Sequence, residues 1–188
     1  FQKAIVSVIS KLIYFSFAAG DMYMNLLCCC KLVDMTLEFG INEYSAKSFA
    51  ALANAVIFAM QDFETSTDFN LIALSMLQKF RGMHHSETTF IAYAVGLGWV
   101  RPLEDCIDPL RHAVAEGMKT GETEFAYWNA FAHSITLPYS IGKPISSILA
   151  ECPRLSLLCE DAAQKAHALE ISVLWQMLHN ISEASRPG

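Results

Sequence analysis

Apolar residues recur along this chain with the spacing of one face of an α-helix. The offsets i, i+3, i+4, i+7, i+8 and i+11 occur in two consecutive segments. These are Phe49, Leu52, Ala53, Val56, Ile57 and Met60, then Phe69, Ile72, Ala73, Met76, Leu77 and Phe80. A helix with 3.6 residues per turn brings such positions onto one side, whereas a strand alternates every second residue. The pattern predicts an all-α fold.

Four further stripes follow the same template. They are Leu26, Cys30, Val33 and Leu37; Leu103, Ile107, Leu110 and Val114; Phe125, Trp128, Ala132 and Ile135; and Leu155, Leu158, Ala162, Ala166, Leu169 and Val173. We interpret each stripe as the buried side of a helix, because one apolar face is what a surface helix turns toward a core.

Residues that start and stop helices stand between the stripes. Gly40 follows one stripe as a helix C-terminus should, and Ser66 or Thr67 is expected to cap the helix through Phe69. Asp108-Pro109 resembles an N-cap followed by the first helical residue. The segment 102–117 is therefore expected to be two short helices or one kinked helix.

Pairing neighbouring stripes gives about four helical hairpins with a period near 40 residues, which is typical of helical solenoids. Their approximate bounds are 22–60, 66–98, 102–139 and 143–181, within a single domain of residues 1–188. A hairpin cannot bury its apolar stripe alone, so we expect the hairpins to stack and share a continuous core.

The composition is rich in apolar residues, with 53% hydrophobic and 17% charged residues, against about 25% charged in ordinary soluble domains. Either the chain enters a membrane or other parts of a longer protein cover its faces. Spanning helices need about 20 apolar residues, and the candidates Phe1–Ala19 and Met22–Phe39 are interrupted by charged side chains. No membrane span is therefore expected, and the start at Phe1 within an expected helix favours a segment of a longer protein.

The charge of the chain bears on the class of partner that it can bind, and its cysteines bear on the redox environment in which it folds. The net charge is −6 and no two Lys or Arg residues are adjacent, so a nucleic-acid partner is not expected. Six cysteines are present, and three of them, Cys28 to Cys30, are consecutive on a helical pattern. They indicate small core residues in a reducing, cytoplasmic environment, not a disulfide framework or a metal site.

Motifs of catalysis are incomplete throughout the sequence. Gly142-Lys143 is followed by Pro144 and lacks the preceding glycine of a phosphate-binding loop, and no Gly-x-Ser-x-Gly elbow occurs. His85-x-Glu87 is half of a zinc-deaminase signature whose Pro-Cys-x-x-Cys half is missing. We interpret His84 and His85 as solvated loop residues, and expect no catalytic residue, cofactor or metal in this chain.

Four residues are candidates for an interaction surface. Trp99 is a large aromatic at a helix end, where core packing is the alternative interpretation. Tyr127, Asn129 and His133 lie off the expected buried stripe and are predicted to face the partner-binding groove of a solenoid.

Several stretches carry a family resemblance, spread over residues 26–150. They are Leu37–Ala46, Asp68–Leu74, Trp99–Leu103 and Gly117–Ala126. Together they resemble the tetratricopeptide-like helical region of very large signalling proteins. Glu122 stands where the family turn usually has Asp, which is a mild departure.

The resemblance implies a stack of tetratricopeptide-like hairpins within a multidomain protein. In that family a protein-kinase-like domain and an AAA-type ATPase of the STAND class precede the helical region, and a GAF sensor and often a histidine kinase follow it. It implies a non-catalytic scaffold or regulatory segment that contacts other domains of its parent chain or partner proteins, with catalysis elsewhere. Two alternatives stay open: a small helical ligand-binding or metal-dependent enzyme domain, and a membrane-associated helical protein.

Overall fold

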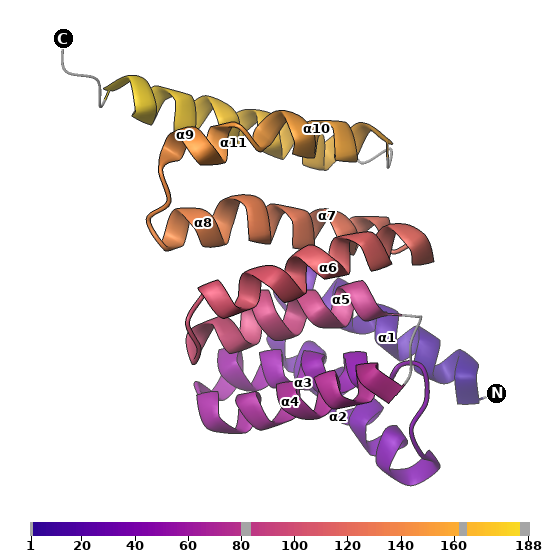
Figure 1. The fold of residues 1–188 in the computed structure, drawn as a ribbon. Coiled ribbons are helices and arrows are strands. Elements are labelled where there is room, and N and C mark those ends of the chain that lie inside the picture. The colour runs from indigo at the N-terminus through magenta and orange to yellow at the C-terminus, as the bar shows by residue number, and fades with distance from the viewer. Residues whose placement is uncertain (1, 80–83, 162–164, 185–188) are drawn as a thin grey trace. The chain divides into compact units, whose positions relative to one another are not determined.

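The computed structural model describes residues 2–79, 84–161 and 165–184, and each regular element in these ranges is a helix. The prediction of an all-α fold is confirmed. The helices form two compact units, Phe1–Pro102 and Leu103–Gly188 (Figure 1). Within the described ranges, no helix has both the length and the apolar content needed to cross a membrane.

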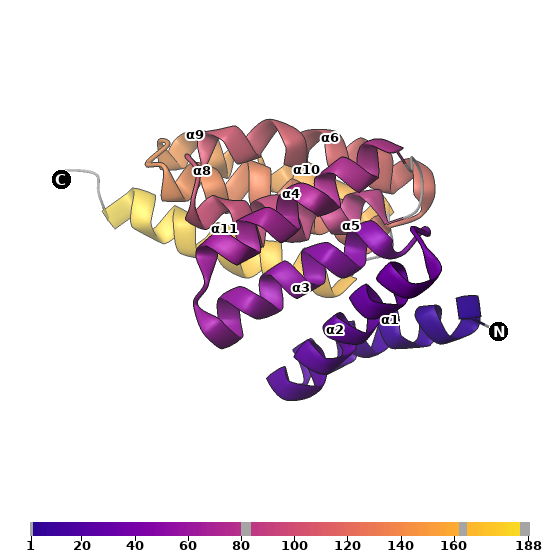
Figure 2. The ribbon, with the colours of Figure 1, turned by 90° about the horizontal axis from the view of Figure 1, so that it is seen from below.

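Unit 1 consists of four long helices followed by one of mixed geometry. The long helices are α1 (Gln2–Ala18), α2 (Met22–Phe39), α3 (Ser45–Met60) and α4 (Phe63–Lys79). The last helix begins as α5 (His85–Thr89), widens into the π-helical η1 (Phe90–Gly96) and ends in the 3₁₀ turn η2 (Leu97–Trp99). Short turns make α1 and α2, and α3 and α4, packed neighbours (Figure 2).

Helix α3 is the centre of unit 1. It packs against α2 on one side and against α4, α5 and η1 on others, and most of its residues are buried. Alanines allow this close packing, because small side chains let several helices approach the axis of α3. Ala50, Ala53 and Ala55 are at most 1% exposed. The surrounding core is completed by larger residues such as Leu32 and Val56.

In the part that the structure describes, unit 2 contains three long helical rods, formed by α6, by α7 with η3 and α8, and by α11, together with the shorter α9 and α10. The bounds are α6 (Glu104–Thr120), α7 (Thr123–Phe131), η3 (Ala132–Thr136, π-helical), α8 (Leu137–Ser140), α9 (Ile145–Leu149), α10 (Cys152–Asp161) and α11 (Lys165–Ala184). Helix α7 runs through η3 into α8 as one rod (Figure 1). The core lies between α7, α9, α10 and α11, around Tyr127, Ile148 and Ile171.

The helix ends agree with the sequence expectation at Gly40 and differ from it at two predicted caps. Gly40 and Gly121 follow α2 and α6 with positive φ, as C-terminal glycines do. Helix α4 begins at Phe63, so the expected cap at Ser66 or Thr67 is wrong. Asp62 caps it instead by accepting hydrogen bonds from the backbone N–H and hydroxyl of Thr65.

Pro109 lies inside a single helix, so Asp108-Pro109 is not a helix start. Helix α6 runs unbroken from Glu104 to Thr120. Its buried face is formed by Cys106, Leu110, Ala113 and Gly117. That continuous face keeps both sides of the proline in one helix, although the ring removes one backbone hydrogen bond.

Two predicted stripes depart from the sequence interpretation. On α2, Cys30 is exposed and Leu37 is 74% exposed, although both were expected on the buried side. The C-terminal stripe differs as well. Leu169 and Val173 were expected on the buried side, yet they are 67% and 65% exposed, while Ile171 and Leu178 are buried. The stripe spans two helices, α10 and α11, and a helical register counted from Leu155 in α10 does not hold in α11. Phe80, which ends one predicted stripe, and Ala162, which lies within another, are outside the described residues.

Candidate functional site

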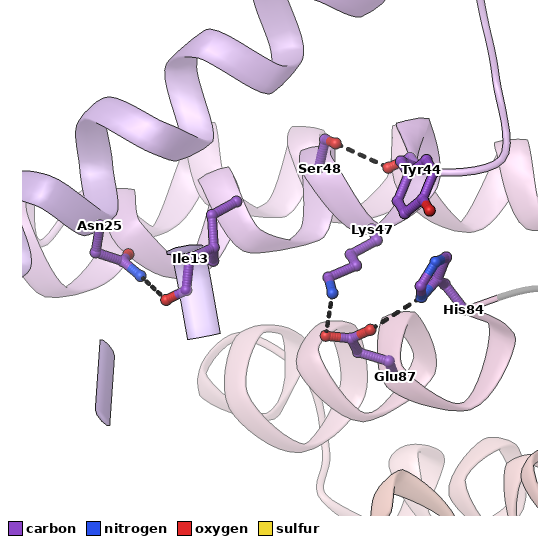
Figure 3. A network of polar contacts seen from close by, with 7 residues as sticks. All are labelled: Ile13, Asn25, Tyr44, Lys47, Ser48, His84 and Glu87. Carbon is purple, nitrogen blue, oxygen red and sulfur yellow. Dashed lines mark hydrogen bonds and ion pairs between the residues drawn. The ribbon is translucent and has the colours of Figure 1, made fainter. Parts of the chain in front are cut away.

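A buried carboxylate links two helices of unit 1. Glu87, in α5, accepts from Lys47 Nζ at 2.7 Å through Oε1 and from His84 Nδ1 at 3.1 Å through Oε2 (Figure 3). The side chains of Glu87 and Lys47 are 8% and 9% exposed. This network is the most buried group of charges that the described residues form.

Local turns place the three side chains. Lys47 lies in the first turn of α3, whose entry is fixed when Asn42 Oδ1 accepts from the Tyr44 N–H and Ser45 Oγ accepts from the Asn42 N–H. His84 precedes α5 in the left-handed conformation, φ 59°, which histidine tolerates better than most residues. The Tyr44 ring lies 4.8 Å from the His84 ring, between centroids, and covers it (Figure 3).

The environment keeps Glu87 ionised. Burial is the largest influence and acts to raise its pKa, but the hydrogen bond from His84 and the charge and hydrogen bond of Lys47 together lower the pKa below its ordinary value. Both carboxylate oxygens are engaged, so the group does not resemble a free acid or base. Its chemistry is that of a buried ion pair that fastens α3 to α5.

These contacts overturn the interpretation of His84 and His85 as solvated loop residues. Both are half-buried, and His85 is the first residue of α5. The half-motif His85-x-Glu87 places its carboxylate against Lys47, not in an open cleft. Across the ranges that the structure describes, no three His, Cys, Asp or Glu side chains gather as a metal site would require.

The four predicted surface residues have different surroundings. Trp99, in unit 1, is 66% exposed and its ring lies 6.2 Å from that of Phe63. Tyr127 and Asn129, in unit 2, are 1% and 0% exposed, so the expectation that they lie off the buried side is wrong. The buried residues of α7 are Ala126, Tyr127, Asn129 and Ala130, whereas the predicted Trp128 is only half-buried and packs at the side of the core. His133 is half-buried on η3.

Tyr127 instead belongs to an aromatic cluster that the sequence did not reveal. Its ring stacks on His167 of α11, its hydroxyl donates to Glu170 at 3.2 Å, and His167 Nδ1 lies 3.1 Å from the same carboxylate. Trp128 approaches His167 edge-on. The partners are some 40 residues away in sequence, so only the tertiary structure brings them together.

The consecutive cysteines divide between core and surface. Cys28 and Cys29 are buried in unit 1, as the core interpretation predicts, whereas Cys30 is exposed. Burial, followed by the neighbouring cysteines, raises the pKa of Cys29 to about 12, so it is a thiol at neutral pH. Asn25, one turn before Cys29, donates to the Ile13 carbonyl and ties α2 to α1 (Figure 3).

His133 lines a polar cavity of unit 2 together with Arg111 and Arg154. Burial, then the charges of these two arginines, lowers the pKa of His133 to about 4. Sequence reasoning missed this cavity, because its lining residues lie in several separate stretches between Arg111 and Arg154.

Comparison with known proteins assigns neither a family nor a function to the chain. A scan of the chain against protein-family models gave no match, and neither did a search of curated proteins.

Proposed function

We propose that the chain is a non-catalytic helical-repeat segment, a tetratricopeptide-like α-solenoid, that serves as a scaffold or regulatory arm in a multidomain ATPase–kinase signalling protein. The observation that carries the proposal is the packing order in unit 1. Each long helix packs on the next in sequence: α1 on α2, α2 on α3, and α3 on α4. Contact between sequence neighbours is the rule by which repeat proteins are built.

The two π-helical segments add support. Segment η1 begins at Phe90 and η3 at Ala132, about 40 residues apart, the length expected for one two-helix repeat. Each follows a short α-helix of its own unit in the same rod. Such widened turns are uncommon, so their recurrence at this interval favours repeated units over an irregular bundle.

An apolar stripe on α2 is the surface we propose for protein contact. Tyr23, Leu27 and Leu37 are 91%, 64% and 74% exposed, and with the exposed Cys30 they follow helical spacing along the outer side of the helix. Only Asp34 interrupts the stripe. Exposed apolar groups of this extent mark interaction sites in soluble proteins, and the occupant we propose is an adjoining helical module of the parent protein.

The alternative of a small metal-dependent enzyme has weaker support. Glu87, its one candidate acid, is committed to Lys47 and His84. The cysteines that the structure describes are all free, and the raised pKa of Cys29 makes it a poor nucleophile or metal ligand. Free thiols also favour a reducing, cytoplasmic setting for the parent protein.

Binding to the adjoining modules of the parent protein tests the proposal. The 188-residue chain should bind a purified adjoining segment in calorimetry, and Leu27→Gln should weaken binding by about tenfold, since one buried leucine contributes about 1.5–3 kcal/mol. Leu157→Gln is the matched control, because Leu157 is 60% exposed and lies on α10. Absence of binding, or equal losses for both variants, contradicts the proposal. So does a parent gene that encodes neither a nucleotide-binding loop nor a GAF or kinase module.

A further inference from the structure

A cavity of about 270 Å³ in unit 2 carries cationic side chains in a chain that is acidic overall. Three cations, Arg111, Lys143 and Arg154, line it with one carboxylate, Glu151. The whole chain has a net charge of −6. The lining is therefore positively charged although the chain is negatively charged overall. This gives the recess a positive electrostatic potential that can attract a small anion.

The lining residues come from separate elements that the fold of unit 2 brings together. Arg111 lies on α6, His133 and Ser134 on η3, Lys143 between α8 and α9, Ser147 on α9 and Arg154 on α10. Because packed helices hold most of these positions, the recess is preformed and does not depend on one mobile loop.

The charges are only partly neutralised by their neighbours. Arg111 pairs with Asp108 on its own helix, and Arg154 lies 3.8 Å from Glu151. Both arginine side chains are more than half exposed, so these pairs are weak and the guanidinium groups are free to turn toward a ligand. Lys143 forms no ion pair with any residue that the structure describes.

Neutral polar groups complete the lining. His133 is uncharged at neutral pH, since burial and the two arginines lower its pKa to about 4, and its Nδ1 lies 3.1 Å from Ser134 Oγ. Ser147 adds a second hydroxyl. Hydroxyl and imidazole groups donate hydrogen bonds to anions, and guanidinium groups match the geometry of phosphate oxygens in pairs.

We propose that this cavity is a binding site for a phosphate monoester dianion, held by Arg111, Lys143 and Arg154. The lining carries three cations and one carboxylate, and the Asp108 carboxylate that pairs with Arg111 lies outside the lining. This excess of positive charge favours a doubly charged ligand over a singly charged one. The volume lies below the roughly 300–1,000 Å³ of pockets for drug-sized ligands, which suits a phosphoryl group with a small substituent. The proposal is independent of the proposed scaffold function, because it rests on unit 2 alone and needs no protein partner.

Calorimetry on the full chain with inorganic phosphate, O-phosphoserine and acetate tests the site. We expect phosphate and O-phosphoserine to bind saturably with Kd below about 1 mM, and acetate to bind at least about tenfold more weakly because it carries one charge. O-Phosphoserine binding more tightly than phosphate would identify an ester as the ligand. Tighter binding of inorganic phosphate would identify the free ion and overturn the ester assignment.

Single-charge variants assign the binding to the cavity. Lys143→Gln and Arg154→Gln should each weaken phosphate binding by roughly tenfold, the effect of losing one charge-assisted hydrogen bond. Lys119→Gln is the control, since it removes the same charge from an exposed position of α6 outside the cavity. Equal weakening in the control would show non-specific attraction and overturn the proposal.

The pKa of His133 provides a second test, which needs no substitution in the protein. Phosphate is singly charged at the pH where His133 titrates, but the bound anion still opposes the two guanidinium charges. Saturating phosphate should therefore raise the pKa of His133 from about 4 in an NMR titration. The proposal is overturned if the His133 resonances do not respond to phosphate, or if none of the three ligands binds saturably.

Discussion

Tyr127 and His167 lie face to face, with ring centroids 3.9 Å apart and planes 12° from parallel. One ring belongs to α7 and the other to α11, so the stack joins the two ends of the unit 2 sequence. Glu170 holds both rings from their edges by contact with the Tyr127 hydroxyl and with His167 Nδ1. The pair therefore fixes the position of α11 on the core more specifically than apolar burial alone.

Two substitutions of Tyr127 should distinguish how much the ring and the hydroxyl each contribute to stability. Tyr127→Phe keeps the stack and loses one hydrogen bond, so we expect a loss of about 0.5–1.5 kcal/mol. Tyr127→Ala also leaves a cavity and should cost about 3–5 kcal/mol. Urea unfolding measures both, with Tyr139→Phe as the control, because Tyr139 is 52% exposed. A Phe variant as damaging as the Ala variant would contradict the importance of the stack.

Removal of Lys47 should destabilise unit 1 strongly. Lys47→Met removes the cation that pairs with the buried Glu87 carboxylate, and breaking a buried pair costs about 3–5 kcal/mol. The double variant Lys47→Met/Glu87→Leu should recover most of this loss in urea unfolding, because no uncompensated charge remains. The exposed pair Lys119 and Glu116 is the matched control, and Lys119→Met should cost less than about 1 kcal/mol. Equal losses at both lysines would refute the buried ion pair.

The pKa of His133 should make folding sensitive to mild acid. Its folded value of about 4 lies below the roughly 6.5 of an unfolded histidine. The unfolded chain therefore takes up the proton first, and the stability contributed by neutral His133 is present above about pH 6.5 and lost as the pH falls through about 4. Unfolding in phosphate-free buffer between these limits should show a shallower loss for His133→Gln than for the natural chain. Parallel curves for the two proteins would disprove this assignment.

The Asn70 side chain occupies the space that a side chain at Gly96 would need, so the two positions should depend on each other. A Cβ at Gly96 would lie 2.2 Å from Asn70 Nδ2, and Asn70 is fully buried. Gly96 has φ −92°, so crowding and not backbone strain opposes a side chain there. Gly96→Ala should cost about 1–3 kcal/mol in urea unfolding. Adding Asn70→Ser, which shortens the opposing side chain, should reduce that cost; an unchanged cost would indicate another cause.

Periodicity predicted the helices far better than the faces they bury. On α4 the predicted stripe included Ile72, which is 39% exposed, whereas Ser66 and Asn70 are buried. On α6 the buried positions are Cys106, Leu110, Ala113 and Gly117, so the prediction is confirmed at Leu110, whereas the predicted Ile107 and Val114 are only half-buried. Helices approach most closely where side chains are small, so residues such as Ala113 and Gly117 can lie on the contact line while neighbouring apolar residues remain half-exposed.

The candidate sites were less accessible to sequence reasoning than the helices. Glu87 was noticed for its spacing from His85, but its partner Lys47 is 40 positions away in an alanine-rich helix and carried no signal. The cationic cavity draws on residues that are isolated in sequence, and a search for consecutive basic residues does not detect such an arrangement.

The sequence by itself determined that the chain is helical and where several of its helices end, because helix formation depends on local spacing, caps and glycines. Only the tertiary structure decided which side of each helix is buried, that Lys47 meets Glu87, and that Tyr127 turns inward onto His167. Those outcomes depend on how neighbouring helices approach one another, and the free energy of that approach is shared among residues far apart in the chain.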